Sequence, residues 1–260
     1  AYEIMPSLVG SEMCIRDSIC VNDSPHAEAV AKLTVPLSEK LLTPYVIPVT
    51  AWLRFGIDKS RIIQYRALDP MAWLDSFKPD KTVLKRLRIS EDRPIVTVRP
   101  EETYAAYLLG KLRGRMMSIN IVEKILDRLC GEAVVIILPR YEEQVDIFKR
   151  RFNGRAIISE EIVDGASLLS YSAVFVGGGG TMSAEAALLG VPTFSCYPGE
   201  PTYVDRFLTD KGLLTRSTKP EKMAKAVAET LKNLKTCKKR QTAKAKNLIS
   251  KILQWVNKAI

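Results

Sequence analysis

From residue 94 onward, short apolar runs alternate with segments whose apolar residues recur at the helical period. The expected strands are Ile95–Val98, Ala133–Leu138, Ala156–Ile158, Ala173–Val176 and Thr193–Cys196. The expected helices lie between them, at Ser118–Leu129, Glu142–Arg151, Gly165–Tyr171 and Met182–Leu189. Such alternation predicts a parallel sheet covered by helices on both faces, and strands that are almost continuously apolar fit a sheet buried in this way.

The preceding segment is less regular. Arg61–Tyr65 predicts a strand, and Asp69–Phe77 predicts a helix with Asp69 as its N-cap and Pro70 as its first residue. Residues 78–93 are charged and contain prolines near both ends, so they are the best candidate for a linker. We therefore expect an α/β protein with a complete Rossmann-like parallel-sheet domain at 93–218 and, at 19–92, the remnant of an N-terminal Rossmann-like domain and its linker.

The two ends of the chain differ from this body. Residues 1–18 (AYEIMPSLVGSEMCIRDS) show neither periodicity nor a signal-peptide pattern and resemble translated adapter sequence. We interpret them as extraneous and the rest as a truncated fragment; a genuine N-terminal tail is the alternative. Residues 219–260 predict basic helices that pack on the body through an apolar stripe, formed by Leu248, Ile249, Ile252, Leu253, Val256 and Ile260.

Composition excludes several classes of protein. The chain is 47% hydrophobic and 26% charged, as in ordinary folded proteins, and its apolar runs are too short to span a bilayer. Five scattered cysteines and a single histidine predict no metal site and favour the cytoplasm. The net charge of +10 falls within 219–260, where eleven Lys and one Arg face Glu221 and Glu229. A solvated helix face explains this cluster of positive charge better than peripheral membrane contact does, and nucleic-acid binding is the least favoured interpretation.

The strongest chemical signal is a run of four glycines, Gly177–Gly180, which we call the glycine turn. It follows the expected strand Ala173–Val176 and precedes Thr181 and the helix Met182–Leu189. Glycines permit positive φ and let a ligand approach the backbone closely. The amides at a helix start favour a phosphate, and Thr181 has a hydroxyl able to cap the helix or to donate to the anion.

Three other interpretations of this turn compete. A P-loop is excluded, because no Lys-Ser/Thr pair follows the last glycine. A dinucleotide fingerprint fits Gly178 and Gly180, and Glu200 lies 20 residues beyond Gly180, but Ser183 replaces the third glycine. A purely structural turn is the third interpretation, although a turn that needs one positive φ has little use for four glycines.

The turn and its surroundings resemble a known family. The residues that carry the resemblance are Val176–Glu185 (VGGGGTMSAE), the continuation AALLGVPTFSCYPG, and VDRFLTDKGLL at 204–214. Asp23–Ala27 and Leu42–Pro44 match the end of a first domain. The resemblance is to an uncharacterised, largely archaeal domain-of-unknown-function family with the glycosyltransferase-B architecture, related to UDP-N-acetylglucosamine 2-epimerases and glycosyltransferases.

The resemblance implies a nucleotide-sugar ligand, with UDP-sugar as substrate or ligand and no other cofactor. The residues that it assigns to the phosphates are Gly178, Gly179, Gly180 and Thr181. Glu185 is assigned to the ribose hydroxyls, and it lies about one helical turn past Thr181 on the same side. A solvent-facing helix charge is the alternative for Glu185.

Further candidates are single residues. Arg99 ends the first strand of the domain, where open α/β sheets bind ligands, and its fork of donors suits a diphosphate; Arg140 follows the second strand similarly. His26 is a candidate acid or base, with Asp23 three residues before it. Asp205 is a candidate for the mouth of the ligand site. For each of these residues the alternative is that it is an ordinary surface or turn residue without a role in binding or catalysis.

The predicted function is nucleotide-sugar binding in glycosyl transfer or sugar epimerisation, with an unknown acceptor. A first domain supplies much of the catalytic machinery in this architecture, so we expect the truncated chain to be inactive. The alternative from another class is a non-catalytic or dinucleotide-binding Rossmann module whose basic tail docks on a membrane or nucleic acid.

Overall fold

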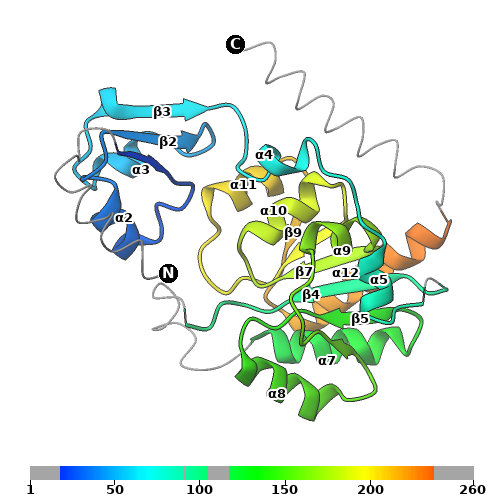
Figure 1. The fold of residues 1–260 in the computed structure, drawn as a ribbon. Coiled ribbons are helices and arrows are strands. Elements are labelled where there is room, and N and C mark those ends of the chain that lie inside the picture. The colour runs from blue at the N-terminus through cyan, green and yellow to red at the C-terminus, as the bar shows by residue number, and fades with distance from the viewer. Residues whose placement is uncertain (1–17, 91, 105–116, 237–260) are drawn as a thin grey trace. The chain divides into compact units, whose positions relative to one another are not determined.

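The computed structural model describes residues 18–90, 92–104 and 117–236, and the chain divides into two compact units (Figure 1). The first unit holds the residues up to Asp69 together with Thr202–Val204. The second holds Pro70–Pro201 and the residues from Asp205 onward.

The first unit is built on a parallel sheet of order β1-β2-β3 in its described part. Its elements are β1 (Ile19–Val21), α2 (Glu28–Thr34), β2 (Lys40–Pro44), α3 (Thr50–Leu53), the 3-10 helix η2 (Lys59–Arg61) and β3 (Ile62–Tyr65). The strand expected at 61–65 is therefore confirmed. Trp52 is fully buried in the core beside Leu41 and Ile47, and its indole N–H donates to Thr43 Oγ1 at 3.1 Å.

This unit exposes an unusual amount of aliphatic side chain, which we call the β1/α2 surface. It comprises Ile19, Val21, Val30, Leu33 and Leu37, all more than half exposed. On α2 only Ala31 is buried, so the helix turns most of its aliphatic residues outward. Among the described residues β1 ends the sheet order, with no strand paired to its outer edge, so this surface favours association with other apolar surfaces.

Replacing Leu33 by lysine and Leu37 by glutamine is expected to reduce self-association without unfolding the protein. Leu33 and Leu37 are 72% and 65% exposed, so little buried area is lost and the free energy of unfolding changes by about 0.5 kcal/mol or less. Light scattering and urea denaturation measure the two effects. The matched control, Leu41→Lys, introduces a charge into the buried core and is expected to unfold the unit. Equal self-association of the surface variant and the wild type would contradict this prediction.

The second unit contains, among the described residues, a six-stranded parallel sheet of order β6-β5-β4-β7-β8-β9. The strands are β4 (Ile95–Arg99), β5 (Val134–Ile137), β6 (Ile157–Ile158), β7 (Val174–Gly177), β8 (Thr193–Ser195) and β9 (Leu214–Arg216). Five of them were expected from the apolar runs; β9 was not, because only Leu214 of its three residues is buried. The sheet confirms the predicted α/β class with parallel, Rossmann-like sheets.

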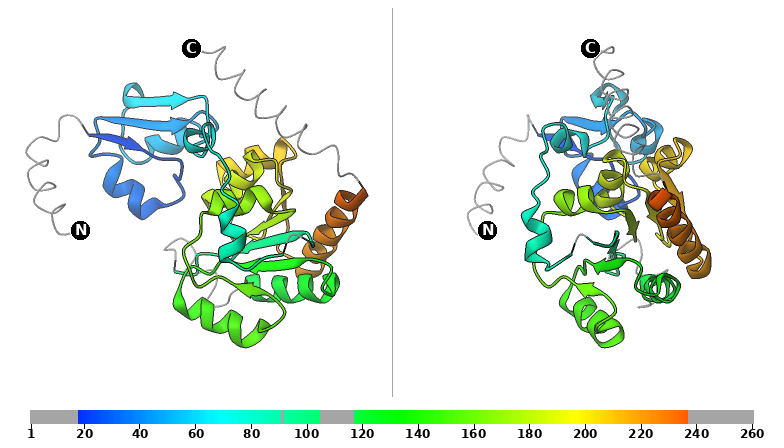
Figure 2. Two further views of the ribbon diagram at one scale, coloured as in Figure 1. Left: turned by 45° about the vertical axis from the view of Figure 1, so that its right-hand side comes forward. Right: turned by 90° about the vertical axis from the view of Figure 1, so that its right-hand side faces the viewer.

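Helices cover both faces of this sheet. The helices that cover it are α5 (Thr82–Arg86), α7 (Met117–Leu129), α8 (Glu142–Phe152), α9 (Gly165–Tyr171), α10 (Thr181–Leu188) and α12 (Pro220–Thr236). Helix α4 (Met71–Leu74) contacts α10, and α11 (Tyr203–Asp210) precedes β9. Alternate residues of each strand point to opposite faces: Val96 and Val98 pack with α7, α8 and α12, whereas Ile95 packs with α5 and α9. Figure 2 shows α12, in orange, beside α7, in green.

Two local expectations differ from the structure. Helix α4 begins at Met71 with Pro70 as its N-cap residue; Asp69 does not cap it, because its carboxylate accepts the Tyr65 hydroxyl instead. The charged segment 78–93, which was predicted to be a linker, contains helix α5. Two residues of this helix, Val83 and Leu84, are buried in the core of the second unit. That segment is thus part of the packed unit, and the chain passes between the units at Asp69–Pro70.

The basic C-terminal region is described only as far as α12. This helix packs on α7 and buries Met223, Val227 and Leu231, as expected for a helix that covers the body. The apolar stripe at 248–260 lies outside the described residues. Within the described ranges, no helix has the length and hydropathy needed to cross a bilayer.

Candidate functional site

The glycine turn lies at the topological switch point of the sheet, between the adjacent strands β4 and β7, where the order of the strands reverses. From β4 the chain proceeds through β5 to β6 on one side, and from β7 it proceeds through β8 to β9 on the other. Arg99, the last residue of β4, pairs directly with Gly177, the last residue of β7. Ligands of open α/β sheets bind at this switch point, beyond the carboxyl ends of the strands.

Each glycine from Gly178 to Gly180 meets a different structural requirement. A Cβ on Gly178 would lie 2.3 Å from the backbone nitrogen of Glu101, so the two chain segments approach too closely for any side chain. Gly179 and Gly180 have φ values of +103° and +94°, which side chains rarely permit. A Cβ on Gly177 would lie 2.5 Å from Ser183 Oγ, so all four glycines have a structural reason. Gly177, Gly178 and Gly179 are buried and Gly180 is exposed, so the turn reaches the surface at its last residue.

The turn leads into the first turn of α10, whose backbone amides are not capped by a side chain. Gly180 is the N-cap residue of α10 and provides no side-chain cap, so the expectation that Thr181 caps the helix is wrong; Thr181 is its first, exposed residue. Among the described residues, the amides of Gly180 and Thr181 have no hydrogen-bond acceptor. Unpaired amides at the positive end of a helix dipole are suited to an anion.

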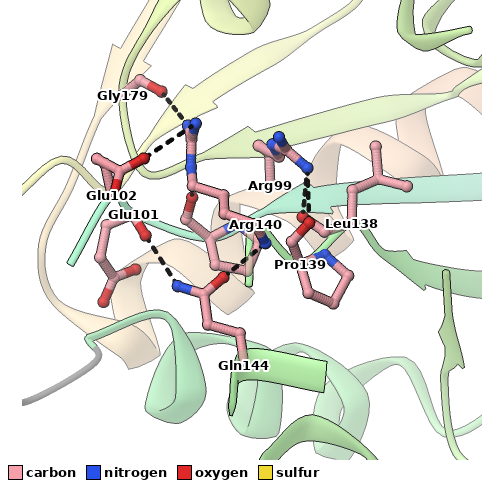
Figure 3. Close-up of polar contacts among 9 residues, drawn as sticks. Arg99, Glu101, Glu102, Leu138, Pro139, Arg140, Gln144 and Gly179 are labelled. Atoms are coloured by element: carbon pink, nitrogen blue, oxygen red, sulfur yellow. Dashed lines mark hydrogen bonds and ion pairs between the residues drawn. The ribbon is translucent and has the colours of Figure 1, made fainter. Parts of the chain in front are cut away.

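Arg99 extends over this edge from β4. Its Nη1 donates to the carbonyl oxygens of Leu138 and Pro139, both at 2.9 Å (Figure 3). Burial, and after it the charge of Arg140, lower the pKa of Arg99 to about 10, although Glu102 acts in the opposite direction. A half-buried guanidinium whose charge is disfavoured in this way gains from a nearby anion.

Arg140, which follows β5, connects the loops on both sides of the switch point. Its Nε donates to the Pro100 carbonyl at 3.0 Å and its Nη2 to the Gly179 carbonyl at 3.3 Å, while Nη1 lies 3.8 Å from a Glu102 carboxylate oxygen (Figure 3). Gln144 accepts from the Arg140 amide at 2.8 Å. The structure therefore brings both predicted arginines to the glycine turn.

Glu185 lies one turn further along α10, as expected. Its carboxylate accepts a hydrogen bond from the indole N–H of Trp73 at 3.0 Å. Burial raises the pKa of Glu185; the bond from Trp73 lowers it, and the charge of Asp164 raises it. Glu185 is therefore held by an aromatic partner and is not a free helix-surface charge.

Glu101 is the functional residue that the sequence did not reveal. It is 1% exposed, and both of its carboxylate oxygens accept from the amide of Ser118, at 3.2 and 3.3 Å, at the start of α7. Its carbonyl accepts from Gln144 at 3.1 Å. Seventeen residues separate Glu101 from Ser118, so no capping motif marks the pair. The first turn of α7, the first described helix after β4, is thus occupied by the protein's own carboxylate.

Replacing Glu101 by glutamine is expected to lower the free energy of unfolding by about 1 to 2 kcal/mol. The change keeps the shape but removes the negative charge at the positive end of α7 and leaves only one oxygen to accept. Urea denaturation measures it. The control on the same helix is Glu123→Gln, which breaks an exposed ion pair to Arg151 and should cost less than about 1 kcal/mol. A smaller effect for Glu101 than for Glu123 would contradict the capping role.

The remaining candidates lie elsewhere. Asp205 is in the first turn of α11 and is 7% exposed. Asp23 follows β1 in the first unit and accepts from the Ser24 hydroxyl at 2.6 Å, and His26 lies just before α2. Nothing in their geometry assigns a catalytic role, so the roles of Asp23, His26 and Asp205 stay predictions. Among the described residues, no group of three or more His, Cys, Asp and Glu side chains is placed to hold a metal.

Sequence comparison identifies relatives of unknown activity. The family described as "Protein of unknown function (DUF354)" matches residues 9–260. A relative from Methanocaldococcus jannaschii, "Uncharacterized protein MJ0665", is 32% identical over 218 residues, which is 82% of this chain and 61% of the relative. The chain thus spans less than two thirds of that protein. These matches confirm the resemblance to an uncharacterised family with archaeal members.

Solved structures with the same fold include proteins crystallised with UDP. The M. jannaschii UDP-GlcNAc 2-epimerase, in complex with UDP-GlcNAc and UDP, has a TM-score of 0.57 and 19% identity over 75% of this chain and 55% of its own. Anabaena Alr3699/HepE, in complex with UDP and glucose, has a TM-score of 0.59 and 13% identity over 94% of this chain and 68% of its own. At these identities the likeness establishes the glycosyltransferase-B-like fold.

Proposed function

Because the chain belongs to the DUF354 family, whose description leaves its activity open, we propose a function from the site itself: the second unit binds a nucleotide-sugar, with the diphosphate on the glycine turn. The observation that carries this proposal is the unpaired helix start at Gly180 and Thr181, at the switch point of the sheet. The Arg140 guanidinium donates to the Gly179 carbonyl, and the Arg99 guanidinium, at the end of the adjacent strand β4, donates to the carbonyls that follow β5. Backbone amides, a helix dipole and arginine forks together suit a diphosphate better than any single one of them.

The proposed roles follow from position. The amides of Gly179, Gly180 and Thr181 bind phosphate oxygens, and Arg99 and Arg140 neutralise their charge. The amide of Gly178, which was also expected to bind phosphate, instead donates to the Arg99 carbonyl at 2.8 Å and is left out of the proposed set. Glu185, one turn along α10, accepts hydrogen bonds from the ribose hydroxyls. UDP is the proposed nucleotide because the fold is shared with proteins whose structures contain UDP.

A dinucleotide fits the site less well. In a dinucleotide-binding Rossmann domain the pyrophosphate lies on the helix start that follows the first strand. The first described helix after β4 is α7, and the buried Glu101 carboxylate already accepts from its Ser118 amide. A second anion at that position would be repelled, so the α10 start is the better phosphate site.

Thermal denaturation with graded ligands tests the proposal. UDP and UDP-GlcNAc should raise Tm, UMP should do so less, and uridine and NAD should have no effect. At a ligand concentration of about 100 Kd the expected stabilisation is about 2.7 kcal/mol, which corresponds to roughly 5 to 10 °C for a domain of this size. No shift with UDP, or an equal shift with uridine, would overturn it.

We propose that the nucleotide-sugar is used for glycosyl transfer or sugar epimerisation. The two reactions differ in what else they require: a transferase needs an acceptor, whereas an epimerase changes the sugar nucleotide alone. Incubation of UDP-GlcNAc with a full-length relative, followed by chromatography with and without candidate acceptors, distinguishes them. An unchanged sugar nucleotide under all conditions would leave a binding function and exclude both reactions.

A further inference from the structure

Trp73 is an exposed tryptophan with a specific polar partner. It lies on α4, whose Met71 is buried and anchors the helix on the second unit, yet its own side chain is 45% exposed. Its indole Nε1 donates to Glu185 Oε1 at 3.0 Å, across 112 residues of sequence. A tryptophan needed only for packing would bury more of its large apolar area.

The bond to Trp73 restricts a side chain that is otherwise free to rotate. A glutamate on a helix surface loses rotamer entropy when it is ordered by a ligand. Trp73 orders the carboxylate in advance through Oε1 alone and leaves Oε2 to accept from another donor. The arrangement therefore prepares Glu185 for a ligand with hydroxyl donors.

We propose that Trp73 is a positioning residue that holds the Glu185 carboxylate in the orientation that recognises the ribose hydroxyls of the bound nucleotide. This inference rests on the proposed function. One further observation supports it. The same hydrogen bond lowers the pKa of Glu185, while burial and the Asp164 carboxylate, at the start of α9, raise it. Trp73 thus also favours the ionised carboxylate, the form that accepts two hydrogen bonds.

The variant Trp73→Phe keeps an aromatic ring and removes the N–H donor. UDP affinity, measured by calorimetry, is expected to fall about five- to tenfold, because the ligand must then order the Glu185 carboxylate itself. The wild type should prefer UDP to 2′-deoxy-UDP, and the variant should lose most of this preference. Inorganic pyrophosphate, which has no ribose, should bind both proteins equally.

The pH dependence separates positioning from packing. UDP binding should weaken on acidification as Glu185 becomes protonated. Without the Trp73 bond the pKa of Glu185 rises, so the weakening should begin at a higher pH in Trp73→Phe than in the wild type. Trp52→Phe is the matched control: it removes an indole bond to Thr43 in the core of the first unit and should lower stability without changing UDP affinity.

The outcomes of this experiment are distinct. If UDP binds the wild type and Trp73→Phe keeps its affinity, its preference for the ribose 2′-hydroxyl and its pH profile, the positioning role is wrong while the proposed function stands. If neither UDP nor pyrophosphate binds the wild type, the proposed function fails first, and the inference fails with it. Combining Trp73→Phe with Glu185→Gln should weaken UDP binding no more than Glu185→Gln alone, because both changes remove the same interaction.

Discussion

Replacing Gly178 by alanine is expected to lower the free energy of unfolding by about 3 kcal/mol, the largest effect at the glycine turn. The new Cβ would lie 2.3 Å from the nitrogen and 2.4 Å from the Cα of Glu101. These are backbone atoms, so no side-chain rotation relieves the overlap and the two segments at the switch point must separate. Urea denaturation measures the loss, and UDP binding should disappear with it because the turn is displaced.

Two other glycines separate this overlap from backbone strain. Gly180 (φ +94°) and Gly131 (φ +82°) both have positive φ, but a Cβ on Gly180 would come only within 3.6 Å of Arg140, and one on Gly131 would meet nothing within 4 Å. Alanine at either position should cost about 1 to 2 kcal/mol through φ alone. Only Gly180→Ala should also weaken UDP binding. A loss for Gly178→Ala no greater than that for Gly131→Ala would show that the turn tolerates a side chain.

The elements of the second unit were predictable because its sequence repeats one pattern. Strands such as Val134–Ile137 are buried on both faces, so their apolar runs are continuous, and helices such as α7 have one apolar face with the helical period. Short elements lack this signal. Strand β9 buries a single residue, and β1 in the first unit buries none, so neither has a pattern to detect.

The glycine turn was predictable because its conformation selects glycine, and Arg99, Arg140 and Glu185 were predictable because a strand end or the helical spacing places them near it. Gly179 and Gly180 have positive φ, and the backbone of another segment approaches Gly178 closely. Both conditions require glycine, so the sequence alone identified the turn. Glu101 and Trp73 act through partners that only the folded chain brings near. Their neighbours in sequence give no hint of Ser118 or of Glu185, so their roles required the structure.

The two arginines give the site an excess of positive charge in the protein without a ligand. Arg99 and Arg140 lie close enough for the charge of one to lower the pKa of the other, and Glu102 is the acidic group that opposes this effect. The diphosphate of the proposed ligand would supply the missing negative charge. Such a site is maintained at a cost in the free protein, which is typical of groups retained for binding rather than for stability.

Replacing Arg99 by methionine is therefore expected to separate binding from stability. Methionine fills much of the same volume and removes a half-buried charge, which offsets the loss of the bonds to the Leu138 and Pro139 carbonyls, so the free energy of unfolding should change by about 1 kcal/mol or less. UDP affinity should fall roughly 10- to 100-fold, as expected for a charge-assisted hydrogen bond worth about 1.5 to 3 kcal/mol. Calorimetry measures the UDP affinity, and urea denaturation measures the free energy of unfolding.

In the control Arg155→Met, which breaks an exposed ion pair to Asp127, UDP affinity should not change. Unchanged UDP affinity in Arg99→Met would remove Arg99 from the site, and unfolding of that variant would make Arg99 a structural residue.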